Sequence, residues 1–289
     1  MSERVIIVGP GRMGLALGTA LAQAGAADRL TFYGRALDPP PHPLFESSDA
    51  VEYRVGPHPV PDGTTAVILA VPDDAIAEAA HELAATGDAP PGCAALHLAG
   101  ARSGEPLAPL HAVGYGVGAM HPLQTVADPW TAADRLAGSA FALAGEPVAL
   151  AAARRIVSAI GGRPLVIPSA VRPLYHAAAV FASNYLVALV AVAARLLAQA
   201  GIAEQDALPA LLPLLRGTLD NVEDLGVSAA LTGPVVRGDL DTVRLHLGRV
   251  APAERDLYRA LGRQTVRLAR AAGLDEERAA ELEALLDAD

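Results

Sequence analysis

Short runs of β-branched and other apolar residues alternate with alanine-rich, amphipathic stretches over residues 1–167. This alternation is typical of βαβ units, in which helices join parallel strands and cover both faces of one sheet. The expected strands are residues 5–8, 30–33, 66–71, 94–98, 116–120, 140–143 and 164–167, and the main expected helices are residues 13–24, 73–85 and 147–160. The pattern therefore predicts an α/β domain built on a doubly wound parallel sheet.

Beyond Pro168 only helical periodicity remains. The expected helices are residues 174–199, 206–225, 239–247, 253–272 and 275–286, of which Asp239 and Asp275 are expected to cap the third and the last. We therefore expect an α/β domain over residues 1–168 followed by an all-helical domain over residues 169–289.

The first of these helices contains residues 177–194, which carry no formal charge and are apolar nearly all round. Its length permits a membrane span, but Ser183 and Asn184 near its middle favour a helix buried in protein, because polar groups in lipid are costly without partners. The later helices are amphipathic and too few to cover it easily. The sequence therefore predicts a homodimer that packs the helical domains together.

A glycine-rich turn follows the first expected strand and opens a helix. Its residues are Gly9, Pro10, Gly11, Arg12, Met13 and Gly14, with the spacing G-x-G-x-x-G. The first glycine permits a tight turn, the second lets the backbone approach a pyrophosphate, and the third allows close packing of helix on strand. The helix start supplies amide donors for the phosphates. This predicts a Rossmann dinucleotide site, extended by the turn at Val71 and Pro72 after a later strand.

The end of the second strand selects between NAD and NADP, because a side chain there contacts the adenosine ribose. The residues are Tyr33, Gly34 and Arg35, with no acid to bind a free 2′-hydroxyl and a guanidinium able to bind a 2′-phosphate. We therefore expect NADP(H), with Gly34 and Arg35 at the ribose and Arg12 as a second phosphate contact. The alternative for either arginine is a solvated surface side chain.

Composition removes several classes of function. A net charge of −10 argues against a nucleic-acid or anionic-membrane partner. The chain contains no lysine, which excludes Schiff-base chemistry and a lysine general base. Cys93 is the single cysteine, so neither an intrachain disulfide nor a multi-cysteine zinc site is expected, and the histidines lack ligand spacing. The single cysteine and the histidine spacing lead us to expect no bound metal. The apolar run at residues 5–8 is too short for a secretory signal, and we expect a cytoplasmic protein.

Five segments carry a family resemblance: AVPDDAI at 70–76, HLAGA at 97–101, GAMHPLQT at 118–125, YHAAAVFASNYLVAL at 175–189 and LTGPVVRGD at 231–239. The first segment, with the glycine motif and the long apolar helix, resembles the 6-phosphogluconate dehydrogenase-like superfamily of NAD(P)-dependent oxidoreductases. The other four resemble, more closely, the Rossmann-like proteins that carry the DUF2520 domain. The resemblance implies an NADP-dependent reductase of a small 2-oxo acid, with ketopantoate in pantothenate synthesis as the first substrate to consider. A prephenate-type dehydrogenase and a non-enzymatic NADP(H) sensor remain as alternatives.

The resemblance also suggests catalytic residues. In the superfamily, the long helix of the second domain presents a lysine four residues before an asparagine. Here Asn184 matches the asparagine, Val180 stands where the lysine would be, and His176 lies one turn earlier on the same expected face. His121 ends a sheet strand beside the expected cleft. We expect His121 and His176 as candidate proton donors and Asn184 as the residue that orients the carbonyl, with structural histidines as the alternative.

Residues of the helical half are candidates for binding the substrate, for which we expect a small carboxylate. Arg237 can bind a carboxylate through two parallel hydrogen bonds, and Thr232 lies in the same loop. Thr218 and Asn221 share one helix face. The alternative for Arg237 is an ion pair with Asp239.

Overall fold

The computed structural model describes residues 3–46 and 49–288, which form two compact units, Met1–Ser183 and Asn184–Asp289. The boundary expected at Pro168 coincides with the end of the sheet. The division between the units falls later in the chain, so the first long helix after the sheet is grouped with the sheet.

The first unit contains one eight-stranded sheet. Its strands are β1 Glu3–Val8, β2 Ala27–Gly34, β3 Val51–Val55, β4 Ala66–Leu69, β5 Ala94–His97, β6 Gly116–Pro122, β7 Ala140–Gly145 and β8 Arg163–Val166. The order is β3-β2-β1-β4-β5-β6-β7-β8, with β1 to β6 parallel, β7 antiparallel to β6, and β8 parallel to β7. The predicted doubly wound sheet is confirmed, and the reversal at β7 is a feature that the apolar pattern did not predict.

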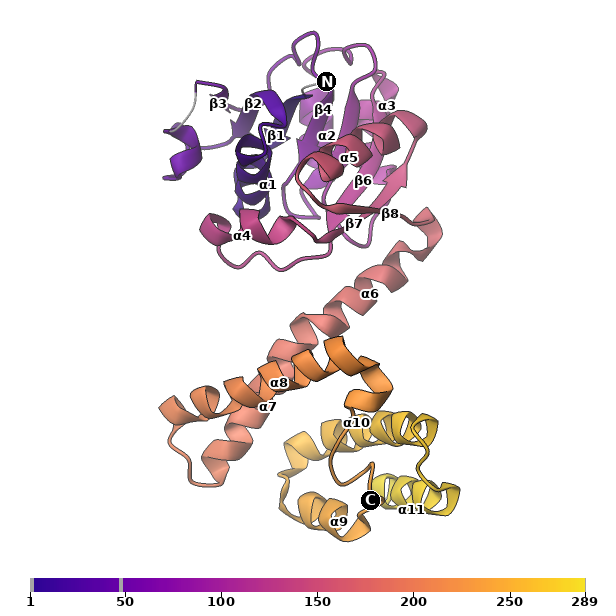
Figure 1. Cartoon of the computed structure of the whole chain (residues 1–289). Coiled ribbons are helices and arrows are strands. Elements are labelled where there is room, and N and C mark those ends of the chain that lie inside the picture. The colour runs from indigo at the N-terminus through magenta and orange to yellow at the C-terminus, as the bar shows by residue number, and fades with distance from the viewer. Residues whose placement is uncertain (1–2, 47–48, 289) are drawn as a thin grey trace. The chain divides into compact units, whose positions relative to one another are not determined.

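Helices cover both faces of this sheet (Figure 1). They are α1 Arg12–Gln23, α4 Pro129–Leu136 and α5 Pro147–Ala159 on one face, and α2 Ile76–Ala84 and α3 Ala108–Ala112 on the other. The strand residues alternate between the two layers, as the pleat requires. On β1, Val5 and Ile7 join the α1 layer while Ile6 joins the α2 layer, and all three are at most 2% exposed.

The chain leaves the sheet through α6 Arg172–Ala182, and the helix stops at Ser183, whose φ of −119° and ψ of −72° depart from helical values. The chain resumes as α7 Asn184–Gln199. The continuous helix predicted over residues 174–199 is therefore interrupted. As a correction, residues 176, 180 and 184 do not share one uninterrupted helical face, because the break precedes Asn184.

The second unit is all-helical. Its helices are α7, α8 Glu204–Ala230, α9 Leu240–Arg249, α10 Pro252–Ala271 and α11 Glu276–Asp287. Its core is formed by Val235, Val243, Val266, Ala269, Ala279, Leu282 and Leu286, which come from α9, α10, α11 and the loop before them. Asp239 accepts a hydrogen bond from the Thr242 amide at 3.1 Å, and Asp275 accepts one from the Arg278 amide at 3.1 Å. Both predicted helix caps are confirmed.

The apolar segment is exposed in this single chain. α7 contains no buried residue, and Val187 on it is 69% exposed. Among the described residues, one helical segment, Ser169–Gln199, is long and apolar enough to cross a membrane by length and composition alone, with a mean hydropathy of 2.0. The core helix of a soluble protein meets the same test but is mostly buried, whereas the apolar 18-residue window of this segment is 0% buried. Among the described residues, neither unit by itself supplies the burial predicted for this segment.

Candidate functional site

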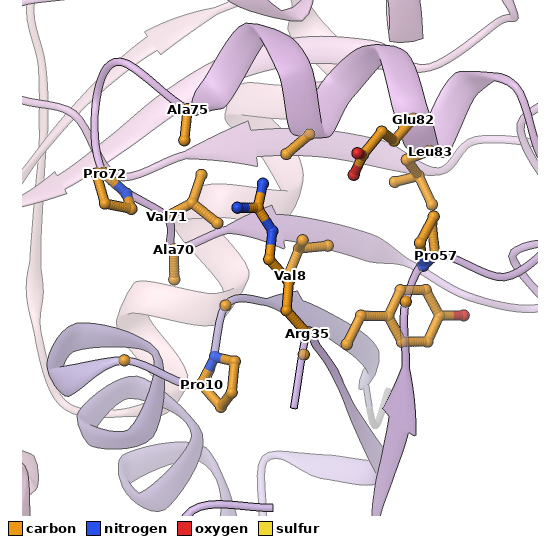
Figure 2. A pocket seen from close by; sticks show the side chains of 16 residues that line it. Val8, Pro10, Arg35, Pro57, Ala70, Val71, Pro72, Ala75, Glu82 and Leu83 are labelled. Carbon is orange, nitrogen blue, oxygen red and sulfur yellow. The ribbon is translucent and has the colours of Figure 1, made fainter. Parts of the chain in front are cut away.

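A cavity of about 390 Å³ lies where β1, β2 and β4 end (Figure 2). In open parallel sheets this edge is where ligands bind, and α1 begins there with its free amide groups. The lining residues are Val8, Gly9, Pro10, Gly11, Tyr33, Gly34, Arg35, Gly56, Pro57, Ala70, Val71, Pro72, Ala75, Ala79, Glu82 and Leu83. The pocket combines the glycine motif with the end of the second strand, as the sequence predicted.

The glycine motif has the geometry that a pyrophosphate site needs. Gly9 has a φ of +101°, and a Cβ there would lie 2.8 Å from the carbonyl oxygen of Ala70. A Cβ on Gly14 would lie 2.1 Å from the carbonyl oxygen of Gly9, so α1 can pack this closely on β1 only with glycine there. Gly11 precedes α1, and a Cβ on it would meet no atom within 4 Å, which leaves its backbone open to a ligand. These residues fit a bound dinucleotide.

Arg35 reaches across this pocket from the end of β2. Its Nη2 lies 3.6 Å from Oε2 of Glu78 on α2, and its side chain is 77% exposed. Figure 2 shows the guanidinium in the middle of the pocket. A Cβ on Gly34 before it would lie 2.3 Å from the Tyr53 hydroxyl, so a larger residue there would have to displace the Tyr53 ring.

The expected cofactor residues divide into two groups. Seven of them line the pocket: Gly9, Pro10, Gly11, Gly34, Arg35, Val71 and Pro72. Arg12, Met13 and Gly14 do not line it: Arg12 is the exposed first residue of α1, Met13 follows it, and Gly14 is buried in packing against β1.

A cluster of histidines lies farther along the same sheet edge, at the ends of β5 and β6. His121 Nδ1 is 2.9 Å from the Tyr175 hydroxyl of α6, and the His121 and His176 rings meet edge to face with centroids 5.5 Å apart. The structure thus brings together the two histidines singled out in the sequence. It also brings together His121 and Tyr175, which are 54 residues apart in the chain.

Gly100 makes this approach possible. A Cβ on Gly100 would lie 2.2 Å from His176 Nδ1 and 2.9 Å from His121 Nε2, so both imidazoles converge on a position that admits no side chain. His176 Nδ1 is buried and has no hydrogen-bond partner among the described residues. The glycine of the HLAGA segment therefore shapes the histidine cluster.

Burial lowers the pKa of two histidines in the cluster. It lowers the pKa of His121 to about 4, and positive charge on His176, Arg172 and His97 adds to this effect. Burial also lowers the pKa of His97, whose Nδ1 accepts a hydrogen bond from the Ala99 amide at 3.1 Å and whose Nε2 donates to the Ser103 carbonyl. His121 is therefore uncharged at neutral pH.

Arg172 fixes the start of α6 against the sheet. It is fully buried, and its guanidinium donates to the carbonyl oxygens of Arg102 at 2.5 Å, Ala99 at 2.7 Å and Ala142 at 3.4 Å. A buried guanidinium satisfied by carbonyls alone keeps its positive charge, because its pKa is too high for deprotonation. Arg172 therefore positions Tyr175 and His176 one turn later and adds positive charge beside them.

The cofactor pocket and the histidine cluster belong to one unit and one sheet edge. The carboxylate of Asp73, in the turn that begins with Val71 and Pro72, acts electrostatically on His97. A ligand bound along this edge would therefore have a dinucleotide pocket at one end and imidazoles at the other.

The other expected site residues lie in the second unit. Asn184 begins α7 and is exposed. Thr218 and Asn221 are exposed on α8, where the Thr218 hydroxyl donates to the Leu214 carbonyl at 2.9 Å. Thr232 and Arg237 are exposed in the loop before α9, and Arg237 helps to lower the pKa of Asp239. Their roles stay predictions.

Sequence reasoning missed Tyr175, Arg172, His97 and Glu82. The first three have a signal in the sequence, since Tyr175 adjoins His176, Arg172 begins the same helix, and His97 ends a buried strand in the HLAGA segment. Glu82 has none, because its position on α2 matches an ordinary solvated face. Among the described residues, no group of three or more His, Cys, Asp or Glu is placed to hold a metal ion.

Comparison with protein families agrees with this geometry. Residues 139–265 match the model of the domain of unknown function DUF2520. The DUF2520 resemblance is confirmed over this segment. It runs from the start of β7 into α10 and so includes Tyr175 and His176. Among curated proteins, none matches the sequence.

Solved structures share the fold over nearly the whole chain. Protein TM1727 from Thermotoga maritima is 26% identical, with a TM-score of 0.65 over 96% of this chain and 98% of its own. A candidate NADP oxidoreductase from Bacteroides fragilis, BF3122, is 23% identical, with a TM-score of 0.67 over 94% and 98%. A pyrroline carboxylate reductase from Plasmodium falciparum, solved with NADP bound, is 12% identical, with a TM-score of 0.59 over 99% and 100%. These likenesses establish the Rossmann-like fold followed by a helical region.

Proposed function

We propose that this protein is an NADPH-dependent oxidoreductase that reduces a small 2-oxo acid, with ketopantoate as the first substrate to test. The observation that carries the proposal is the His121–Tyr175–His176 cluster on the same sheet edge as the glycine-motif pocket. The Bacteroides and Plasmodium proteins, one described as a candidate NADP oxidoreductase and the other solved with NADP bound, support the cofactor class.

Different residues of the pocket bind different parts of NADPH. The amides at Gly11 and the start of α1 hold the pyrophosphate, Gly9 forms the tight turn, and Gly14 lets α1 pack closely on β1. Arg35 binds the 2′-phosphate and exchanges its 3.6 Å contact with Glu78 for a charge-assisted pair. When bound, NADPH supplies the hydride to the substrate carbon, and the chain's own residues place the substrate and deliver the proton.

We assign the proton to His176 and a positioning role to His121. Burial keeps His121 uncharged at neutral pH, so the role of proton donor is assigned to the neighbouring imidazole of His176, whose ring centroid lies 5.5 Å from that of His121. Neutral His121, held at Nδ1 by Tyr175, keeps Nε2 for a hydrogen bond to the substrate oxygen. His176 Nδ1 is enclosed against Gly100, so Nε2 is the atom from which the proton leaves.

The substrate carboxylate is assigned to Arg237, with Thr232, Thr218 and Asn221 as further hydrogen-bonding groups and Asn184 orienting the carbonyl. Arg237 is exposed and therefore accessible to a ligand. Replacing Arg237 with Gln should raise the KM for a 2-oxo acid while the Kd for NADPH stays unchanged. An unchanged KM would mean that Arg237 does not bind the substrate and acts only on Asp239.

A cytoplasmic homodimer is part of the same proposal. The exposed apolar surface of α7, on which Val187 is 69% exposed, needs cover in water, and a second copy of the helical unit offers the same surface in return. Sedimentation should give a particle of twice the 29.5 kDa chain mass at micromolar concentration. A stable monomer there would refute the dimer.

A panel assay tests the enzyme proposal. NADPH oxidation is followed at pH 7 with ketopantoate and several other 2-oxo acids, and prephenate is offered with NADP⁺ in the reverse direction. We expect turnover of at least one 2-oxo acid. Turnover of prephenate alone would show that the proposed substrate class is wrong and that the prephenate-type alternative is right. Tight NADPH binding without any turnover would favour a sensor, the alternative supported by Val180 at the position of the superfamily's lysine.

A further inference from the structure

The cofactor pocket has a distinct outer end. Figure 2 shows Pro72 and Ala75 at one end, Arg35 in the middle, and Pro57, Glu82 and Leu83 at the other. The glycine motif adjoins the first end, so a dinucleotide that starts there reaches its ribose phosphate at Arg35. The adenine then falls at the outer end, which is the part of the pocket that the proposed function leaves without a recognition residue.

The walls at this outer end suit a flat base. Pro57, Ala79 and Leu83 are apolar lining residues of the pocket, and Ala79 and Leu83 are held rigidly by their burial on α2, where they are 6% and 1% exposed. A planar ring can bury both faces against such walls, and specificity then depends on the few polar groups at its edge. Arg35 and Glu82 are the charged side chains among the lining residues.

The two acids on this side of α2 differ in their partners. Glu78 pairs with Arg35 at 3.6 Å. Glu82 follows it by one turn and lines the pocket, and Figure 2 shows its carboxylate turned toward the cavity. Within the described residues the carboxylate of Glu82 makes neither an ion pair nor a hydrogen bond, and the side chain is exposed, so its oxygens are available to a ligand. An ionised carboxylate only accepts hydrogen bonds, and it therefore selects a ligand with a donor at that place.

We propose that Glu82 recognises the exocyclic amino group of the adenine and thereby selects an adenine dinucleotide over one with a base that carries a carbonyl there. This inference rests on the proposed binding of NADPH and adds a specificity-determining residue to it. Adenine presents two N–H donors at its 6-position, which a carboxylate oxygen can accept. Hypoxanthine presents a carbonyl oxygen at the same atom, and two acceptors facing each other leave both without a proton to share.

The experiment measures the Kd of NADPH and of its hypoxanthine analogue, deamino-NADPH, by nicotinamide fluorescence with the full-length protein. The wild type should bind the analogue about tenfold or more weakly, as for the loss of a hydrogen bond to a charged group. Glu82→Gln should bring the two Kd values together, because the amide can donate to the hypoxanthine carbonyl through Nε2. Its affinity for NADPH should fall and its affinity for the analogue should rise.

Glu78→Gln is the matched control, since it removes the same charge one turn away on the same helix. It should change both Kd values by the same factor, because it frees Arg35 for the phosphate that both ligands carry. Equal binding of the two ligands by the wild type would overturn the role of Glu82 and leave the proposed function intact. A ratio of the two Kd values that stays unchanged in Glu82→Gln would likewise overturn the role of Glu82 and leave the proposed function intact. Failure of the wild type to bind NADPH would instead overturn the proposed function itself.

Discussion

The Tyr175 hydroxyl lies 2.9 Å from His121 Nδ1 and joins the first turn of α6 to the end of β6. This contact fixes the imidazole of His121 and leaves its Nε2 directed at the position over Gly100. A hydroxyl that orients a neutral imidazole acts on catalysis through that ring, and Tyr175 is therefore a positioning residue in the proposed mechanism.

Tyr175→Phe should lower kcat by roughly 2- to 10-fold, the range expected for one neutral hydrogen bond, with the Kd for NADPH unchanged. Its pH–rate profile should shift, because the environment of His121 changes. The second unit offers a matched control: the Tyr258 hydroxyl lies 2.8 Å from His246 Nδ1, and Tyr258→Phe should leave both kcat and the profile unaltered. Identical effects of the two variants would mean that Tyr175 is only structural.

Alanine replacement of the two histidines should separate their roles. His176→Ala should reduce kcat by roughly 10²- to 10⁴-fold, as for loss of a general acid, and His121→Ala should have a smaller effect. NADPH binding, measured by fluorescence, should persist in both because neither residue lines the pocket. If both variants keep near-normal turnover on the identified substrate, a water-mediated proton route must replace the histidine mechanism.

Gly100→Ala tests the shape of the cluster without changing a titratable group. The added methyl would lie 2.2 Å from His176 Nδ1 and must displace the imidazole, so turnover should fall at least about tenfold while NADPH binding stays. Gly104→Ala in the same loop is the control, because its Cβ would meet Val117 at an ordinary 3.4 Å. Equal activity of the two variants would show that the position of His176 is immaterial.

Cofactor choice is expected to depend on Arg35. Arg35→Ala should weaken NADPH binding by about 1.5–3 kcal/mol, as for a hydrogen bond to a charged group, and leave NADH nearly unchanged. Titration calorimetry with both cofactors measures this, with Arg29→Ala at the opposite end of β2 as the control. Equal losses for the two cofactors would identify Arg35 as a structural arginine.

The buried histidines should make stability depend on pH. The pKa of His121 is lowered from 6.5 to about 4, so below pH 6.5 the unfolded chain binds a proton that the folded chain does not. The free energy of unfolding should therefore be highest above pH 6.5 and fall as the pH drops from 6.5 toward 4. The loss from His121 should reach about 1–2 kcal/mol at pH 5.

Urea unfolding at pH 7 and pH 5 measures this difference in stability. His121→Gln should reduce it, whereas His81→Gln, at an exposed position on α2, should not. A difference that is the same in the wild type and in His121→Gln would assign the pH dependence to other groups.

Much of the fold follows from local pattern. The fully buried strands β4 and β5 and the mostly buried β1 were predicted from their apolar runs. The glycine motif placed the cofactor pocket because its backbone geometry depends on adjacent residues. β3 was missed because Val51–Val55 alternates apolar with polar residues at the edge of the sheet, so it carries no continuous apolar run. The break at Ser183 was missed because the flanking residues keep a helical, apolar pattern.

By itself the sequence determined the α/β domain, the glycine motif with Arg35 after the second strand, and the histidines as candidates, because each depends on a few consecutive residues. Tertiary structure alone decided that His121 and His176 meet over Gly100, that Tyr175 holds His121, and that Glu82 turns toward the pocket. It also lowered the pKa of His121. The pKa of an imidazole depends on which distant groups enclose it, and the burial that lowers the pKa of His121 arises only when β6 and α6 pack together.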